Sequence, residues 1–561
     1  MNRIVVIGGV AAGLKAAAKA RRGDPHASIT VVDKGEIISF GACGMPYYVA
    51  GDVPEIEALM RTAMGNMRDP EYFRHSKGIT VLTQTEAVAI DRQAKQVQLK
   101  KLVSGETDSI AYDKLVIATG ASPVKPPLPG VELANIYPLW RPEDAVAIRQ
   151  GIEQGLFRKA VIIGAGLIGM EMAEALTKRQ LQVTVVEMKE QMFPAFLDPE
   201  IAAIAAKYAA AKGIELLSGE TVQRFSGNTV VTGVVTDKRT LPADLVLLAV
   251  GARPNTELAK AAGLVIGESG AIAVDDQLRT SDPDIYAGGD CAENVHLVSG
   301  KKVFAPMGST ANKHGRVIGE NLCGGHVKFR GVLNTVVAKI HDLTVGKTGL
   351  SEREAKQLGY EYVTAMIAGG DKPHYMPGSR LITVKLIAEA QTGRVLGLQA
   401  VGEGEVAKRV DVVATLLTFG GSIDDLFAAD LSYAPPYNTP IDSVAVAANA
   451  VMNKLAGRLK GISPLAAKEK MASRQTVFLD VRTAGECRQL RLADCPKVQY
   501  IPLAGLRSRL AELNKDDEIV AFCKVSLRGY EAELILAGAG FENVKVMEGG
   551  VAAWPFGCEQ E

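Results

Sequence analysis

Residues 160–169 read AVIIGAGLIG, an apolar run that leads into three glycines spaced as G-x-G-x-x-G. The apolar run predicts a buried strand, and residues 170–179 (MEMAEALTKR) predict a helix. Residues 183–187 (VTVVE) then predict a second, parallel strand. A strand–turn–helix–strand unit with this glycine spacing is typical of dinucleotide-binding α/β folds.

Each conserved feature of such a turn has a physical role. Gly164 allows the tight turn, Gly166 lets the backbone approach a pyrophosphate, and Gly169 lets the helix pack on the strand. The helix N-terminus offers free N–H groups to phosphates. Glu187 ends the second strand, where a carboxylate accepts a ribose hydroxyl and repels a 2′-phosphate. The unit therefore predicts a nicotinamide dinucleotide site that favours NADH over NADPH.

The same arrangement occurs at the start of the chain. A strand-like run at residues 3–7 precedes GGVAAG and an Ala-rich helix through Arg22, and a second strand ends at Asp33. Gly8, Gly13 and Asp33 keep the dinucleotide pattern, although Val10 stands where the middle glycine is expected. Two nucleotide units in one chain indicate a protein that binds two dinucleotides.

The composition of the chain limits the classes of protein to which it can belong. A chain of 561 residues needs several domains, and its 47% hydrophobic content is that of a folded, soluble protein. Lys+Arg and Asp+Glu both number 63, which argues against nucleic-acid binding. Without an apolar run of roughly 20 residues or a signal peptide, we expect no membrane span and a cytoplasmic protein. The seven cysteines form no CxxC, so we expect neither a disulfide scaffold nor a metal site.

The order of the expected elements predicts an α/β protein of four parts. Two Rossmann-like domains are followed by an α+β domain, a linker and a small α/β module. The boundaries we assign are residues 1–113 with 246–325 for the first dinucleotide domain, 114–245 for the second, 326–454 for the α+β domain, 455–470 for the linker and 471–561 for the module.

Two further motifs identify the first dinucleotide. Ala118-Thr119-Gly120 ends a strand-like run, and residues 280–290 (TSDPDIYAGGD) place Asp290 after a strand of small residues. Over about residues 1–450 the chain resembles the two-dinucleotide flavoprotein disulfide reductases. The resemblance implies FAD in the first unit, with Asp290 on its ribityl chain. The competing interpretation is a double Rossmann protein without flavin.

Cys43 is the candidate redox thiol. It lies in SFGACGMPY (residues 39–47), where glycines and a proline predict a loop that begins a helix, and a helix N-terminus acidifies a thiol. Relatives with a redox dithiol carry a second cysteine five positions later, where this chain has Tyr48. A lone thiol reacts through a mixed disulfide, a persulfide or a sulfenic acid.

Other features resemble the coenzyme A disulfide reductase branch. Single-cysteine peroxidases and oxidases carry a histidine in the first glycine turn, and this turn has none. Lys15, Lys19 and Arg22 lie on one helix face, either as a solvated face or, as in that branch, at the phosphates of coenzyme A. The resemblance also assigns Ser39 to this substrate site.

The branch also implies a homodimer in which tyrosines of the partner approach the redox thiol. Tyr375, in HYMPG, and Tyr433, in LSYAPPY, are the matching positions. A phenol can donate a proton to a leaving thiolate; the alternative is simple interface packing. Ala42 departs from the branch, which has asparagine before the redox cysteine.

The C-terminal module resembles a rhodanese domain. LDVR at residues 479–482 is followed by Cys523-Lys-Val-Ser-Leu-Arg528. A C-x-x-x-x-R loop can converge its N–H groups on the sulfur while Arg528 supplies a cation, which stabilises a thiolate and its persulfide. Ser526 stands where glycine is common, and Cys487, Cys495 and Cys558 are expected to be structural.

These features together predict an NADH- and FAD-dependent reductase of coenzyme A persulfide, polysulfide or coenzyme A disulfide. Cys523 would pass sulfane sulfur to coenzyme A, and Cys43 would break the resulting sulfur–sulfur bond. One alternative is an NADH oxidase or peroxidase that uses a Cys43 sulfenic acid. Another is a redox-sensing or sulfur-carrier protein without turnover.

Overall fold

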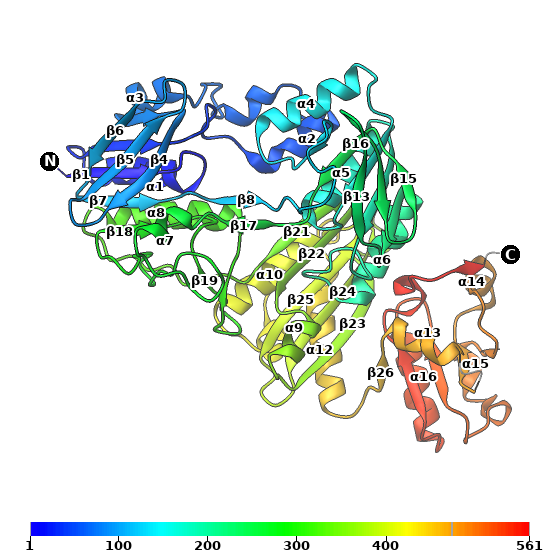
Figure 1. The fold of residues 1–561 in the computed structure, drawn as a ribbon. Coiled ribbons are helices and arrows are strands. Elements are labelled where there is room, and N and C mark those ends of the chain that lie inside the picture. Colours follow the sequence, from blue (N-terminus) through cyan, green and yellow to red (C-terminus); the bar gives the residue numbers. More distant parts are fainter. Residues whose placement is uncertain (1, 473–474, 560–561) are drawn as a thin grey trace. The chain divides into compact units, whose positions relative to one another are not determined.

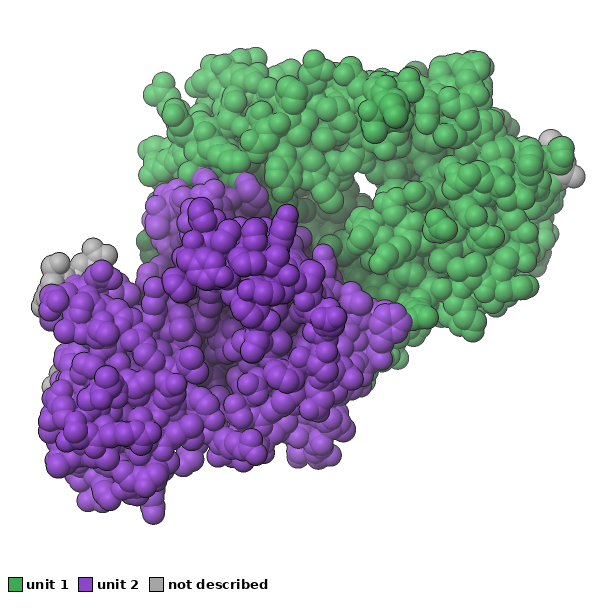
Figure 2. All heavy atoms as spheres, turned by 180° about the vertical axis from the view of Figure 1, so that it is seen from behind, with its two compact units in different colours: residues 1–188, 220–332 green, residues 189–219, 333–561 purple. Residues whose placement is uncertain are grey.

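The computed structural model describes residues 2–472 and 475–559. These described residues form two compact units, one within residues 1–188 and 220–332 and the other within residues 189–219 and 333–561 (Figure 2). Within these described segments, no helix is both long and apolar enough to cross a membrane.

The first unit contains the N-terminal dinucleotide fold (Figure 1). Its parallel sheet has the order β18-β7-β1-β2-β3, and three further strands form an antiparallel sheet. The sheet strands are β1 (Arg3–Ile7), β2 (Ser28–Val32), β3 (Thr80–Leu82), β7 (Lys114–Ile117) and β18 (Ile285–Ala287), and the antiparallel strands are β4 (Thr85–Asp91), β5 (Gln96–Lys101) and β6 (Thr107–Ala111). The helices are α1 (Ala12–Gly23), α2 (Met45–Ala50), α3 (Pro70–Lys77), α7 (Glu257–Ala261) and α8 (Gly308–Asn321).

Helices α1 and α8 approach each other closely because glycines line the contact. A Cβ at Gly315 would lie 2.4 Å from the carbonyl oxygen of Ala12, and one at Gly319 would lie 2.6 Å from that of Ala16. Only glycine permits this spacing. The packing holds α1, and with it the first glycine turn, in a fixed position.

The second dinucleotide fold lies in the same unit. Its strands β11, β10, β16 and β9 are adjacent in that order and all parallel. The bounds are β9 (Ile136–Tyr137), β10 (Lys159–Ile163), β11 (Gln182–Glu187) and β16 (Leu245–Leu248), with α4 (Pro142–Glu153), α5 (Leu167–Lys178) and the antiparallel strands β13 (Val222–Gly227), β14 (Val231–Thr236) and β15 (Thr240–Pro242).

The predicted boundaries between the two dinucleotide domains are wrong by one strand each. Strand β7 begins at residue 114 but pairs with β1, and β16 ends at residue 248 but pairs with β10. The chain crosses between the folds only after these strands, where β8 (Ala121–Pro123) and β17 (Ala252–Pro254) form an antiparallel pair. Strand β7 therefore belongs to the first dinucleotide fold and β16 to the second.

The second unit is built on an antiparallel sheet in the order β21-β22-β25-β24-β23, which confirms the α+β character expected there. The strands are β21 (Val336–Ile340), β22 (Leu343–Gly349), β23 (Tyr362–Gly370), β24 (Leu381–Glu389) and β25 (Val395–Gly402). The helices are α6 (Pro199–Ala211), α9 (Glu352–Gln357), α10 (Val406–Thr418), α11 (Ile423–Ala428) and α12 (Ser443–Leu455).

The C-terminal module, in the same unit, is a parallel sheet in the order β26-β31-β30-β27-β29. The strands are β26 (Gly461–Ile462), β27 (Val477–Asp480), β29 (Val498–Tyr500), β30 (Ile519–Phe522) and β31 (Val544–Met547), and β28 (Arg491–Leu492) pairs with β32 (Cys558–Glu559). The helices are α13 (Pro464–Ala472), α14 (Ala484–Gln489), α15 (Leu503–Leu506) and α16 (Leu527–Gly538).

The predicted linker at residues 455–470 is largely part of this module. Strand β26 pairs with β31, and Ala467 of α13 is buried in the core with Phe478. The segment lacks strand periodicity because its strand has only two residues. The linker between the antiparallel-sheet domain and the C-terminal module is therefore the short stretch between α12 and β26.

Candidate active site

The first glycine turn has the close contacts expected at a dinucleotide. Gly8 has a φ of 113°, and a Cβ there would lie 2.1 Å from the carbonyl oxygen of Ala118. A Cβ at Gly13 would lie 2.0 Å from the carbonyl oxygen of Gly8. Asp33 fixes the turn, because its Oδ2 accepts the Gly9 N–H at 2.6 Å. Val10 is 36% exposed, so its side chain projects outward and the turn forms without the middle glycine.

The second turn repeats this geometry. Gly164 has a φ of 103°, and a Cβ at Gly169 would lie 2.0 Å from the carbonyl oxygen of Gly164. Glu187 Oε2 accepts the Ala165 N–H at 2.9 Å, as Asp33 does in the first turn. A Cβ at Gly166 would meet no protein atom within 4 Å, so open space lies beside this backbone. Both turns therefore fit a dinucleotide backbone.

The remaining flavin-motif residues lie at the carboxyl ends of β7 and β18, the edge where open α/β sheets bind ligands. Thr119 and Asn255 hold each other: the Thr119 hydroxyl donates to the Asn255 carbonyl oxygen at 2.7 Å, and Asn255 Nδ2 donates to the Thr119 carbonyl oxygen at 2.8 Å. Gly120 has a φ of 67°. Desolvation raises the pKa of Asp290 to about 6. A partly desolvated carboxyl group here fits a hydroxyl-rich ligand such as the ribityl chain of FAD.

Cys43 lies in a short 3-10 turn, η1 (Ala42–Gly44), that leads directly into α2. The thiol is exposed, but its pKa is raised by desolvation and by the carboxylates of Glu171 and Asp290, against a backbone hydrogen bond that lowers it. The groups around Cys43 on its own subunit therefore act against the expected acidification of this thiol. Helix α2 has only six residues, and desolvation and then two nearby acids favour the neutral thiol at its N-terminus.

Glu171 is a site residue that the sequence reasoning missed. It lies on α5, two residues after the last glycine of the second turn, and α2 packs against α5. Desolvation and the neighbouring Glu174 raise the pKa of Glu171 to about 7. A carboxyl group that titrates near neutral pH close to a thiol is suited to proton transfer. The signal available in the sequence was an acid two residues after the last glycine of G-x-G-x-x-G, in the first turn of the predicted helix.

In the coenzyme A phosphate site predicted on α1, Lys15 and Arg22 are exposed, and Lys19 forms an ion pair with Glu320 of α8. A phosphate at Lys19 would have to compete with this carboxylate. Ser39 is buried, with a φ of 53°, and its N–H donates to the Gly9 carbonyl oxygen at 2.9 Å. The structure thus places Ser39 beside the first glycine turn.

Tyr375 and Tyr433 lie in the second unit and are 63% and 49% exposed. Arg409, fully buried on α10, holds both of their loops. Its guanidinium donates to the Asp371 carbonyl oxygen at 3.1 Å, at the start of the first loop, and to Asn438 Oδ1 at 2.8 Å, in the second. Sequence reasoning missed Arg409, since an arginine in a helical run is usually solvated.

The rhodanese-like loop runs from Cys523, at the end of β30, to Arg528, on the first turn of α16. Cys523 is 1% exposed. Arg528 donates two hydrogen bonds to Glu486, at 2.8 and 2.6 Å, and its pKa is raised first by Glu486 and also by the Cys523 thiol. The predicted cation thus lies at the sulfur. Glu486, which orients Arg528, was not predicted.

The other cysteines of the module are inert by environment. Cys487 donates to Asp480 Oδ2 at 3.4 Å, beside the buried Arg482–Asp480 ion pair, and Cys495 packs against the core of the module. Burial raises the pKa of both thiols to about 11, and that of Cys558 is also raised. All seven cysteines are free. Among the residues described, no cluster of three or more His, Cys, Asp or Glu side chains could hold a metal ion.

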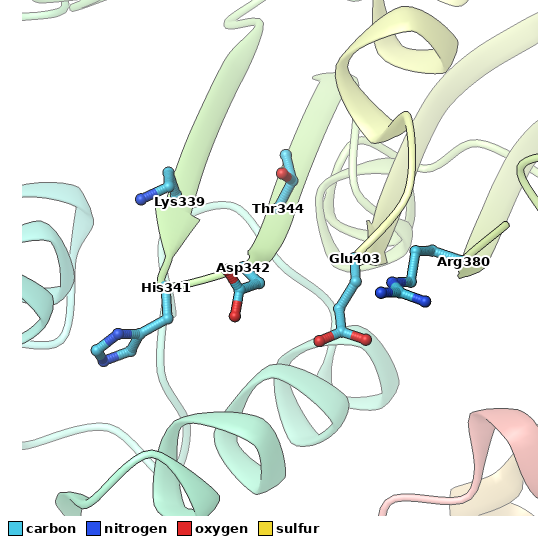
Figure 3. A pocket seen from close by; sticks show the side chains of 6 residues that line it. All are labelled: Lys339, His341, Asp342, Thr344, Arg380 and Glu403. Carbon is cyan, nitrogen blue, oxygen red and sulfur yellow. The ribbon is translucent and has the colours of Figure 1, made fainter. Parts of the chain in front are cut away.

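Figure 3 shows a pocket of about 410 Å³ in the second unit, which contains no predicted site residue. Its walls come from the β21–β22 hairpin and from segments beside β24 and β25. They comprise Lys339, His341, Asp342, Thr344, Arg380 and Glu403. Both acids and bases line it, so it presents no single charge to a ligand.

Comparison with known protein families agrees with this organisation. The profile of the pyridine nucleotide-disulphide oxidoreductases matches residues 2–309, and that of their dimerisation domain matches residues 336–444. A rhodanese-like domain matches residues 463–555. The last match begins inside the segment that we had expected to be a linker.

Individual relatives cover most of the chain. An NAD(P)H sulfur oxidoreductase (CoA-dependent) of Pyrococcus furiosus is 38% identical over 447 residues, 80% of this chain and 98% of the relative. The solved structure of an NAD-dependent persulfide reductase from A. fulgidus has a TM-score of 0.94 at 46% identity, covering 98% of this chain and 100% of that one. Reduced CoADR-RHD of Bacillus anthracis has a TM-score of 0.91 at 33% identity, covering 98% and 97%.

The family uses FAD and NAD(P)H, for which both glycine turns have the required shape. Two thiols in distinct settings, Cys43 and Cys523, accompany the nucleotide folds. The chain belongs to the pyridine nucleotide-disulphide oxidoreductases and is an oxidoreductase of the branch that joins coenzyme A disulfide or persulfide reductases to a rhodanese domain.

Proposed function

We propose that this protein reduces coenzyme A persulfide, and related polysulfide or coenzyme A disulfide, with NADH. The observation that carries the proposal is the pairing of an exposed lone thiol beside the nucleotide folds with a buried thiol in an arginine cradle. The first setting suits bond cleavage by a redox thiol, and the second suits sulfur storage. The printed names of the Pyrococcus furiosus and A. fulgidus relatives support the same chemistry.

The proposed reaction at Cys43 balances without an outside oxidant. The Cys43 thiolate attacks the inner sulfur of the coenzyme A persulfide, a mixed disulfide forms, and hydrosulfide leaves. Two electrons and one proton then restore the thiolate and release coenzyme A. FAD and NADH, when bound, supply the two electrons. With coenzyme A disulfide the leaving group is the coenzyme A thiolate instead.

The chain's own residues would orient substrate and protons. Lys15, Lys19 and Arg22 would bind the coenzyme A phosphates, and Ser39 would line the same site. Tyr375 and Tyr433, exposed on their own subunit, would approach Cys43 of a partner subunit and donate a proton to the leaving thiolate. The matched dimerisation domain supports a homodimer.

The nucleotide-binding residues would divide between the two turns. Gly8, Gly13 and Asp33, with residues 118–120 and Asp290, would hold FAD. Gly164, Gly166 and Gly169 would hold the pyrophosphate of NADH. Glu187 is buried against its own turn, so a 2′-phosphate would meet a carboxylate that cannot easily move away. We therefore propose NADH as the preferred reductant over NADPH.

The test is anaerobic NADH oxidation with coenzyme A persulfide, coenzyme A disulfide, polysulfide, peroxide or oxygen as acceptor. We expect sulfide release from the persulfide, its loss in Cys43→Ser, and slowing of only the polysulfide reaction in Cys523→Ser. Cys495→Ser, at an inert thiol of the same module, is the matched control and should leave all rates unchanged. Fastest turnover with oxygen or peroxide, and none with sulfur compounds, would instead support an NADH oxidase or peroxidase with a Cys43 sulfenic acid.

A further inference from the structure

The segment that follows β31 forms the floor of the Cys523 loop. The Val551 N–H donates to the Cys523 carbonyl oxygen at 3.0 Å, and the Ala552 N–H donates to the Lys524 carbonyl oxygen at 3.0 Å. A Cβ at Gly550 would lie 2.4 Å from the Cys523 carbonyl oxygen, so only glycine fits there. Any displacement of residues 549–552 therefore displaces the loop that carries the sulfur.

The same segment is anchored on the antiparallel sheet of the reductase through Glu548. Glu548 is 5% exposed and forms an ion pair with Lys454, in the last turn of α12. Its Oε2 also accepts the Met366 N–H of β23 at 3.0 Å. Lys454 in turn donates to the Thr364 carbonyl oxygen at 2.7 Å. A charged pair so deeply buried is costly to break, because either partner alone is left without compensation.

Ser526 connects the Cys523 loop directly to the segment at residues 549–552. It has a φ of 94°, a strained conformation that L side chains rarely adopt. Its Oγ accepts the Gly549 N–H at 2.6 Å. Glycine would adopt this φ without strain but would lack the hydroxyl. The hydrogen bond to Gly549 explains why a strained serine occupies a position where glycine is common.

We infer that Glu548 and Ser526 are positioning residues through which the reductase's antiparallel-sheet domain holds the Cys523 loop in its sulfur-accepting geometry. The inference rests on the proposed role of Cys523 as sulfur acceptor. In that step the Cys523 thiolate attacks a sulfur of tetrasulfide, one sulfur–sulfur bond forms, another breaks, and trisulfide leaves. The negative charge passes to the persulfide, and nothing is oxidised or reduced from outside.

The experiment loads the full-length protein with sodium tetrasulfide and follows the added sulfur on Cys523 by mass spectrometry. Glu548→Gln and Lys454→Met should each slow loading about tenfold, since one buried charge loses its partner. The double variant should recover to within about threefold of the unmodified protein, because neither charge then remains. Lys497→Met, which breaks an exposed pair with Asp517 in the same module, is the matched control and should have no effect.

Ser526 is tested by two variants that separate strain from bonding. Ser526→Ala keeps the unfavourable φ and loses the oxygen, so loading should slow about tenfold. Ser526→Gly loses the oxygen but relieves the strain, so its loss should be smaller. The pH dependence of loading is the second readout: a misplaced cradle moves its midpoint to higher pH, whereas a purely structural loss leaves the midpoint unchanged.

The outcomes separate the two proposals. If Cys523 of the unmodified protein takes up no sulfur, the proposed function fails. If it loads normally and the variants at residues 454, 526 and 548 load at the same rate with the same pH midpoint, the positioning role is wrong and the proposed function stands. NADH-driven reduction of coenzyme A disulfide, which needs Cys43 but not the module, should stay within about twofold in every variant.

Discussion

Cys43 and Cys523 are two sulfur atoms in opposite electrostatic surroundings. Cys43 is exposed, and desolvation, followed by the carboxylates of Glu171 and Asp290, raises its pKa. Cys523 is buried beside the guanidinium of Arg528. One thiol is accessible and lies near acids, and the other is shielded but supplied with a cation.

Under the proposed function, this difference separates sulfur storage at Cys523 from sulfur–sulfur bond cleavage at Cys43. A persulfide keeps the charge of the thiolate that it replaces, so a permanent cation suits a sulfur carrier. A thiol that must be released and re-formed in each cycle benefits instead from a nearby group that exchanges protons near neutral pH. Replacements at Arg528, Glu171 and Glu174 test this contrast, and one at Glu320 tests the substrate site. They are ordered from the largest expected effect to the smallest.

Replacing Arg528 should affect Cys523 alone. Hydrogen bonds to charged groups contribute about 1.5–3 kcal/mol, so Arg528→Met should slow tetrasulfide loading of Cys523 by about 10- to 150-fold. Arg528→Lys keeps the charge but not the two-pronged geometry toward Glu486, and should lose about tenfold. Loading is measured by mass spectrometry. NADH oxidation with coenzyme A disulfide serves as the control, and loading by Arg528→Met within threefold of the unmodified protein would contradict a role for the cation.

Replacing Glu171 should make Cys43 more reactive. The Glu171 carboxylate raises the pKa of Cys43 only when it is charged, and its own pKa is raised to about 7. Glu171→Gln should therefore speed alkylation of Cys43 about threefold above pH 8 and leave it unchanged below about pH 6, where the carboxyl group is already protonated. The measurement is the rate of iodoacetamide labelling against pH, corrected with Cys43→Ser.

A second acid on α5 sharpens this test. Glu174 raises the pKa of Glu171 but is not among the groups that raise the pKa of Cys43. Glu174→Gln should move the pH at which labelling changes to a lower value without increasing the rate above pH 8. Equal acceleration by both variants would mean that α5 acts through general loosening rather than through the Glu171 charge.

The smallest effect is expected at the Lys19–Glu320 pair. Glu320→Gln frees Lys19 for a substrate phosphate, and an exposed ion pair contributes about 0–1 kcal/mol. The KM for coenzyme A disulfide should fall about twofold at low salt, with kcat unchanged, and the difference should shrink at high salt. Glu71→Gln, which removes the exposed partner of Arg74 on α3, should change neither constant. A rise in KM for Glu320→Gln would place the substrate phosphates elsewhere.

Local patterns in the sequence predicted the parts of the site that local geometry determines. Both glycine turns, the acids at positions 33 and 187, and the Cys523 loop follow from residues close together in the chain. The errors arose where contacts between segments distant in the sequence determine the structure. The pairing of β7 with β1 moved a domain boundary, and a two-residue strand made part of the module resemble a linker.

The residues that were missed act through packing between elements. Glu171 gains its raised pKa from burial beside α2, and Arg409 gains its role by reaching two loops. Neither property is visible from hydrophobic periodicity, which treats a charged residue on a helix as solvated. The same limit explains Cys43, whose acidification was inferred from its own helix without the acids that face it from elsewhere in the fold.

The place of β18 in the first sheet has a consequence for synthesis of the chain. Strand β7 ends at Ile117, and its outer neighbour β18 begins at Ile285. At a translation rate of about 5–20 residues per second, the intervening segment of about 170 residues takes roughly 10–30 s to emerge. During that interval the apolar β7 is an open sheet edge on the nascent chain, able to pair with other strands. The second dinucleotide fold is inserted between these two strands, and its last sheet strand, β16, emerges before β18. It therefore has time to form before β18 completes the first sheet.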